Sequence, residues 1–189
     1  MLFLDEPAAG PDGVQRLAEG LGAGALPAAT MLQIIGMHVG DAGASELAAA
    51  LGRGALPRLK TLSLVNAAIG DAALVALAPT LRRLPALEHL SLSCNLLGDE
   101  GLAALVAPPP PTTGALTKLK LLDLWYTEVT DAGCAALSAA LDIGVLPALK
   151  TLYLDCSPAS PTWGHSPTAA GALERRLKMR RVRGTVTDM

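Results

Sequence analysis

Aromatic residues are scarce in this chain of 189 residues, at 3% against 51% for hydrophobic residues as a class. A hydrophobic core must therefore be built from leucine, alanine and valine, which favours many thin layers over one thick centre. Charged residues are also few, at 17%. A chain with so much apolar surface to bury is not disordered throughout.

Cysteine and histidine are too few and too scattered to predict a disulfide or metal framework. Cys94, Cys134 and Cys156 are an odd number without a CxxC or Cys/His spacing, which predicts reduced thiols. The three histidines share no metal-ligand spacing. Because phosphate-loop, dinucleotide and calcium-loop motifs are also missing, we expect no cofactor.

The sequence also lacks a secretory leader and a long apolar run. MLFLDEPAAG at 1–10 has no basic region, and no stretch reaches about 18 uninterrupted apolar residues. The net charge of −2 is uneven, since residues 173–189 carry six basic and two acidic side chains, +4, which leaves −6 for residues 1–172. Because an acidic body suits nucleic-acid phosphates poorly, we expect no nucleic-acid partner. The lack of a leader and of a long apolar run predicts a cytoplasmic protein without a membrane span.

What the chain has in quantity is leucine at a regular period. GALP occurs at 24–27 and again at 54–57, and RRLP occurs at 82–85. The leucines that mark the period are separated by 30, 28, 32 and 30 residues, and they are Leu26, Leu56, Leu84, Leu116 and Leu146. A period of this length is typical of solenoids, in which each unit stacks on the next.

Each unit follows the pattern LxxLxLxxNxL, as in Leu59, Leu62, Leu64 and Ile69. The residues in the asparagine slot can hydrogen-bond only in the last three units, where they are Asn95, Thr127 and Ser157. By this pattern, residues 1–157 resemble the leucine-rich repeat family. The resemblance is to its long-repeat, ribonuclease-inhibitor-like branch, similar to the repeat arrays of NOD-like receptors and Ran GTPase-activating proteins. It implies an α/β solenoid of about six units, the first and last incomplete, curved like a horseshoe with a parallel concave sheet and convex helices.

The hydrophobic period changes within each unit. Alternating leucines at 62 and 64 predict a short strand, whereas Leu74, Leu77 and Leu81 recur with helical spacing. We expect Asp71 to cap the helix that it opens. The same slot in other units holds Asp41, Asp99 and Asp131. Pro79 and the prolines at 108–111 should shorten their helices.

The two ends of the chain depart from the repeat. The first unit starts inside a strand pattern without a cap, which suggests a truncated gene model, a fragment of a longer repeat protein, or edge-to-edge self-association. Residues 158–189 predict an irregular loop and a basic capping helix or tail. We interpret the basic run at 175–183 as a solvated cap, with binding to acidic lipid, nucleic acid or an import receptor as the alternative.

Outward-facing strand positions predict the binding surface, because repeat proteins commonly bind partners on the concave face. Three of the five aromatic residues occupy such positions, near the beginning and the end of the array. The strongest candidate surface combines aromatic and carboxylate side chains, Asp123, Trp125, Tyr126, Tyr153 and Asp155. The alternative is that Tyr126 and Tyr153 fill space beneath the carboxyl-terminal cap.

The pattern predicts a non-catalytic scaffold that binds a protein partner on its concave face. His89, Asp123 and a nearby serine can be drawn as a hydrolytic trio, but no strained nucleophile turn or oxyanion site accompanies them. The resemblance also leaves open a regulator of a small GTPase, or a fragment of a larger sensor or receptor. GTPase activation would imply an acidic carboxyl-terminal region, whereas this chain ends with a basic one.

Overall fold

The computed structural model describes residues 2–4, 11–24, 26–107 and 116–154, in which strands and helices alternate along the chain. The strands are β1 (Leu2–Leu4), β2 (Met31–Ile35), β3 (Thr61–Val65), β4 (His89–Ser91), β5 (Leu121–Leu124) and β6 (Thr151–Leu154). The helices are α1 (Pro11–Gly22), α2 (Gly40–Gly52), α3 (Asp71–Leu81), α4 (Asp99–Val106) and α5 (Asp131–Asp142).

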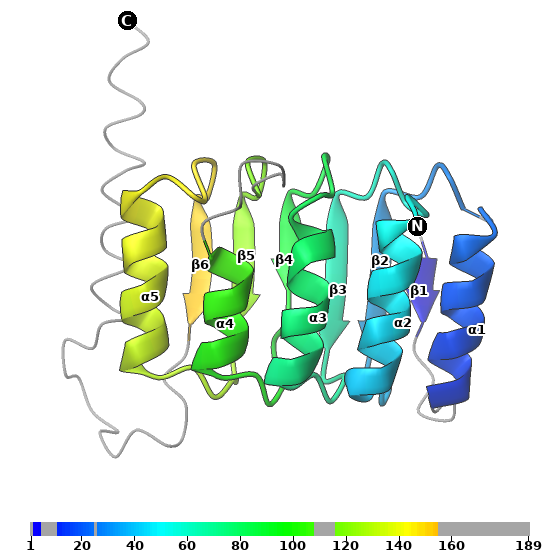
Figure 1. Ribbon diagram of the computed structural model, residues 1–189, viewed down its shortest axis with the longest axis horizontal. Coiled ribbons are helices and arrows are strands. Elements are labelled where there is room, and N and C mark those ends of the chain that lie inside the picture. Colours follow the sequence, from blue (N-terminus) through cyan, green and yellow to red (C-terminus); the bar gives the residue numbers. More distant parts are fainter. Residues whose placement is uncertain (1, 5–10, 25, 108–115, 155–189) are drawn as a thin grey trace, which may run out of the picture.

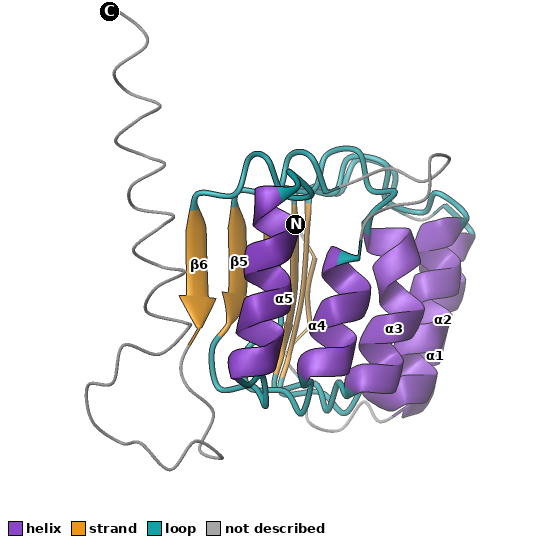
Figure 2. Ribbon diagram, turned by 60° about the vertical axis from the view of Figure 1, so that its left-hand side comes forward, coloured by secondary structure: helices purple, strands orange, loops and turns teal. Residues whose placement is uncertain are grey.

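The described strands form a single parallel sheet in which their spatial order equals their sequence order, β1 to β6. The leucine at the second strand position pairs with its equivalent in the next unit, as Leu62 does with Leu90 and Leu90 with Leu122. The helices stand in a row in front of the sheet (Figure 1). Figure 2 shows that the described helices all cover the same face of the sheet.

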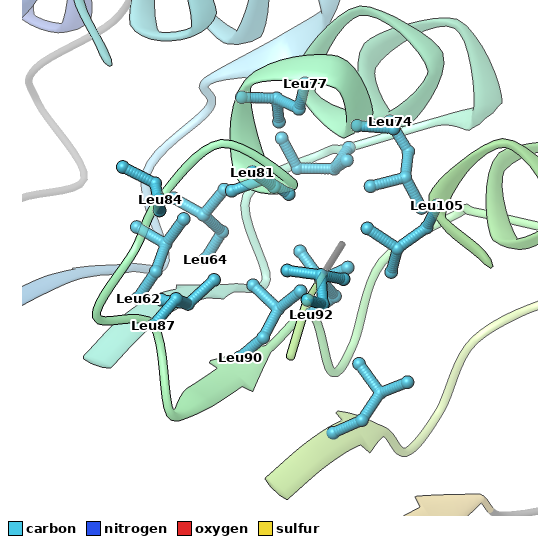
Figure 3. Close-up of a cluster of buried hydrophobic side chains, with 14 of the residues drawn as sticks. Leu62, Leu64, Leu74, Leu77, Leu81, Leu84, Leu87, Leu90, Leu92 and Leu105 are labelled. Carbon is cyan, nitrogen blue, oxygen red and sulfur yellow. The ribbon is translucent and has the colours of Figure 1, made fainter. Parts of the chain in front are cut away.

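A continuous layer of leucine side chains lies between the sheet and the helices. Leu62 and Leu64 point from β3 toward Leu74, Leu77 and Leu81 of α3 (Figure 3). All five side chains are fully buried, and equivalent leucines repeat this arrangement along the array. Burial of one such side chain stabilises the fold by about 2 kcal/mol, so this layer supplies most of the apolar stabilisation.

The stacking of unequal elements bends the array. Neighbouring parallel strands lie about 4.8 Å apart, while packed helices need about 8–10 Å. The sheet therefore lines the concave face and the helices form the convex face. This α/β leucine-rich repeat architecture confirms the fold class predicted from the leucine pattern.

Proline limits the helices of two units. Helix α3 contains Pro79 in its last turn and has 11 residues, compared with 13 in α2. Helix α4 ends at Val106, after only eight residues and just before the proline run at 108–111. Arg82 donates from Nη1 to the carbonyl oxygen of Ala107 at 3.1 Å, and thus binds the chain where α4 stops.

The asparagine slot connects neighbouring units where it can hydrogen-bond. Asn95 is buried, and its Oδ1 accepts from the backbone N–H groups of Ala67 at 2.9 Å and Ile69 at 3.0 Å in the preceding unit. Its Nδ2 donates to the carbonyl of Leu64 at 2.6 Å and to two carbonyls of its own unit. Thr127 donates only within its own unit, to Leu124 at 2.8 Å. Ser157 lies outside the described residues.

The aspartates that recur at the helix starts make a different contact from the one that we predicted. Helix α3 has Gly70 at its N-cap, and Asp71 does not cap that helix. Instead, Asp71 Oδ1 accepts from Gly98 N–H at 2.7 Å and Gly101 N–H at 2.9 Å, at the start of α4. The prediction of capping within one unit was therefore wrong, because neighbouring helices start close enough for a carboxylate to reach across.

Asp99 makes the same contact with the next unit. It accepts from the N–H groups of Thr130 at 2.8 Å and Gly133 at 3.0 Å and from Thr130 Oγ1 at 2.5 Å. Glycine at the third helical position makes room for the carboxylate, since a Cβ at Gly101 would lie 2.6 Å from Asp71 Oδ1.

The corresponding position in α3 is Ala73, and there the carboxylate of Asp41 makes no hydrogen bond to the start of the helix. The Cβ of alanine occupies the space that the carboxylate fills in the other two junctions. The first of these junctions therefore lacks the bridge that the later ones have.

We predict that Asp99→Ala lowers the free energy of unfolding by about 1.5 kcal/mol, because two helix N–H groups lose their acceptor. Asp41→Ala is the matched control, since Asp41 occupies the same slot without these bonds, and we expect a loss below about 0.5 kcal/mol. Urea unfolding followed by circular dichroism measures both. Equal losses would show that the carboxylate acts on its own helix and not on the next one.

Asn95→Ala should cost about 3 kcal/mol, because it leaves buried N–H and carbonyl groups of two units without partners. Thr127→Val removes one hydrogen bond at the equivalent slot with little change in volume, and should cost about 1 kcal/mol. Denaturant midpoints of the two variants provide the comparison. A loss at Asn95 no larger than that at Thr127 would contradict the bridging role.

Candidate functional site

Three columns of side chains cover the face of the sheet that lies opposite the described helices. Leucines at the second and fourth strand positions point into the core, so the first, third and fifth positions point outward. The second and third columns contain the outward residues that the sequence predicts. The first column was missed, although the same two-residue period extends to it, and it consists of Met31, Thr61, His89, Leu121 and Thr151.

Large aromatic side chains gather on β6 and in the turn that follows β5, and these two strands lie side by side (Figure 2). Trp125, Tyr126 and Tyr153 are 48%, 56% and 51% exposed. We call these three residues with Asp123 the aromatic patch. Of the predicted site residues, Asp123 lies on β5, Tyr153 on the neighbouring strand β6, and Trp125 and Tyr126 in the turn that follows β5. Asp155 lies outside the described residues.

The rings have a defined mutual arrangement. The centroids of Trp125 and Tyr126 are 4.4 Å apart, with an angle of 68° between the ring planes, an edge-to-face contact. Tyr153 is the direct neighbour of Asp123 across the sheet and stands diagonally from Trp125. Side chains at such diagonal positions are within reach of each other when they are aromatic.

Tyr126 lies in a turn with a left-handed backbone, φ 51°. The equivalent residues Gly36, Asn66 and Cys94 also have positive φ, so the turn belongs to the repeat and does not require an aromatic residue. Glycine adopts this conformation without cost, whereas a bulky side chain does not. The tyrosine at this slot is therefore better explained by its exposed ring than by the turn.

Asp123 organises the polar part of the aromatic patch. Its Oδ1 accepts from the backbone N–H of Trp125 at 3.1 Å, and its Oδ2 accepts from Ser91 Oγ at 2.8 Å on the neighbouring strand. Ser93 Oγ lies 3.2 Å from Ser91 Oγ and completes a short chain of hydrogen bonds. The carboxylate is thus held in place on both sides, and it fixes the backbone that carries Trp125.

The hydrolytic trio does not assemble. Ser91 donates its hydroxyl proton to Asp123, and the Nδ1 of His89 lies 3.4 Å from Thr61 Oγ1 on the preceding strand. A nucleophilic serine would need to donate to the histidine, with the carboxylate on the other ring nitrogen. The observed pairings instead join Ser91 and Asp123 in a structural contact.

Leu96 is an exposed side chain that the sequence analysis did not include in the site. It lies in the loop after β4, and Glu128 occupies the equivalent position in the loop after β5. Its exposure could have been predicted from the sequence, because it lies between two repeat positions that face the core, Asn95 and Leu97. It adds an apolar residue beside the unit that carries Trp125 and Tyr126.

Charged side chains are segregated between the two edges of the array. The edge where strands end and helices begin carries the carboxylates of Asp41, Asp71, Asp99, Glu100, Glu128 and Asp131. The opposite edge carries Glu88 and Asp142 and, in larger number, the cations of Arg53, Arg58, Lys60, Arg82, Arg83, Lys118, Lys120 and Lys150. Both arrangements complement the helix dipoles. Since Trp125 and Tyr126 directly follow β5, they lie at the acidic edge.

An ion-pair ladder lies at the basic edge. Lys120 Nζ is 2.6 Å from Glu88 Oε2, and Lys60 Nζ is 4.0 Å from Glu88 Oε1. The hydrogen bond from Lys120, with the charges of both lysines, lowers the pKa of Glu88 and keeps it ionised. Lys120 is therefore already paired at the start of the strand that carries Asp123.

Within the described part of the chain, no group of three or more His, Cys, Asp or Glu side chains is arranged to hold a metal ion. None of the described helices has the length and apolar character that crossing a membrane requires.

Comparisons with known proteins agree with the architecture. Residues 83–106 and 115–138 match the family model described as Leucine Rich repeat, and no curated protein matches the chain significantly. A solved structure titled "Leiomodin-1 Actin-Binding Site 2 (ABS2)" is similar, with 14% identity and a TM-score of 0.58 over 92% of this chain and 94% of that chain. The tropomodulin C-terminal domain from Caenorhabditis elegans is similar with 18% identity and a TM-score of 0.53, over 92% and 99%. At these identities the likeness concerns the fold, so the chain is an array with the leucine-rich repeat fold, and two of its units match the family's own pattern.

Proposed function

We propose that this chain is a non-catalytic scaffold that binds a protein partner through the aromatic patch on its concave sheet. The observation that carries the proposal is the concentration of three half-exposed aromatic rings on β6 and in the turn that follows its neighbour β5, in a chain with only five aromatic residues. Tryptophan and tyrosine are the residues that most often dominate the binding energy of protein interfaces. Asp155 belongs to the proposed surface by its place in the repeat.

The rest of the outward face explains why the patch would dominate. At the third strand position the preceding units carry Ser63 and Ser91, and at the fifth they carry Val65 and Ser93. Ser63 and Ser93 are largely buried in spite of their outward position, so they offer little contact area. A partner that spans the sheet would contact the large aromatic side chains of this chain at β5 and β6.

The structural neighbours support the class of partner. One of them is titled as an actin-binding site, which shows that a leucine-rich repeat fold of this size can serve protein recognition. At 14% identity, the likeness supports a protein as partner without specifying which one.

The proposal also includes an assignment to the ribonuclease-inhibitor-like branch of the leucine-rich repeat family. A period of 28 to 32 residues with a helix in each of the described full units is what suggests the ribonuclease-inhibitor-like branch. The free thiol of Cys94 is consistent with a reducing, cytoplasmic environment.

The double variant Trp125→Ala with Tyr153→Ala tests the proposal. Proteins retained by the wild-type chain from an extract are identified, and a purified partner is titrated against both forms by calorimetry. We expect the double variant to bind at least about 100-fold more weakly, since two interface anchors are removed.

The matched control is Val75→Ala with Ile143→Ala, which removes two exposed hydrophobic side chains outside the patch. This control should bind within about threefold of the wild type. An unchanged affinity of the Trp125 and Tyr153 variant, or an equal loss in the control, would contradict the proposed binding surface.

A further inference from the structure

Asp123 is a carboxylate without a cation in the described part of the chain. It accepts hydrogen bonds from a backbone N–H and a serine hydroxyl, and no lysine or arginine among the described residues forms an ion pair with it. The nearest cation along the chain, Lys120, is bound to Glu88 at 2.6 Å. The negative charge at the centre of the aromatic patch is therefore not neutralised by a described side chain.

The hydrogen bonds of Asp123 leave it able to bind a further group. Each carboxylate oxygen has about two acceptor directions, and each oxygen uses one of them in the network described above. The two existing bonds hold the carboxylate in a fixed orientation. A donor from a partner would thus meet an acceptor that is already positioned and costs little to order.

The aromatic rings around Asp123 favour the same kind of group. Tyr153 stands directly beside it on β6, and Trp125 lies two residues after it, in the turn that follows β5. The face of an aromatic ring attracts a cation, and tryptophan does so most strongly. A planar guanidinium can in addition stack on a ring while it donates to a carboxylate.

The surrounding charges agree with this preference. Glu128 and Asp131 follow Tyr126 on the same unit, and Asp99 lies at the start of the neighbouring helix. An anionic partner would be repelled there. A purely apolar partner would strip water from the Asp123 carboxylate without replacing its interactions, which is unfavourable.

We propose that the aromatic patch recognises a cationic side chain of the partner, an arginine, whose guanidinium lies against the rings of Trp125 and Tyr153 and donates to Asp123. This inference rests on the proposed function and specifies its chemistry. It predicts that the partner presents an arginine on an exposed segment that contacts β5 and β6.

A fluorescence titration tests the inference without a known partner. In a Trp163→Phe background, Trp125 is the single tryptophan and reports on its own surroundings. The probes are N-acetyl-argininamide and N-acetyl-citrullinamide, which have nearly the same shape, while only the first carries a charge. We expect argininamide to change the Trp125 emission with an affinity at least about fivefold higher than that of citrullinamide.

Two variants locate the charge that is responsible. Asp123→Asn keeps the shape of the side chain and should weaken argininamide at least about fivefold, which brings it close to citrullinamide. Asp131→Asn removes a carboxylate of the same edge outside the patch and should leave the affinity within about twofold. Equal binding of the two probes, no response to argininamide up to about 100 mM, or equal effects of the two variants would overturn the inference.

Failure of this inference is distinguishable from failure of the proposed function. If capture of the partner requires Trp125 and Tyr153 but Asp123→Asn leaves the affinity for the partner unchanged, the binding surface stands and the cationic anchor is wrong. If argininamide binds as expected but the partner is indifferent to Trp125 and Tyr153, the proposed function is wrong and the cation site stands alone.

Discussion

Burial of the leucine layer between the sheet and the helices is the interaction on which the rest of the structure depends. A strand of three to five residues and a helix of 8 to 13 residues cannot bury an apolar face alone, so each unit needs its neighbours. The resulting stack points every second side chain of a strand into the core. The intervening side chains point away from the core, and a binding surface can develop at their positions.

Polar contacts between units refine this stack in its later part. Asn95 bridges back to the preceding unit, while Asp71 and Asp99 reach forward to the next helix. The first of these junctions, at Asp41, has no such bridge. The polar contacts are thus concentrated in the units that lead to β5, whose outward face carries Asp123 and Trp125, and this supports a rigid platform for recognition at that end.

Much of the fold follows from the sequence, because alternation and helical spacing are local properties that one unit displays by itself. The outward position of Trp125 and Tyr153 follows for the same reason. The capping partner of Asp71 could not be derived, since it depends on how far one helix stands from the next. The hydrogen bond from Ser91 to Asp123 likewise depends on the register between strands. It makes Ser91 a residue that positions Asp123 and not the nucleophile of a hydrolytic trio.

Site-specific photocrosslinking tests most directly whether a partner binds the concave face at β5 and β6. A photoreactive phenylalanine analogue is placed at position 153 in one sample and, on the convex face, at position 75 in another. We expect a crosslinked partner from position 153 and none from position 75. A crosslink from position 75 alone would place the partner on the helices and contradict the account.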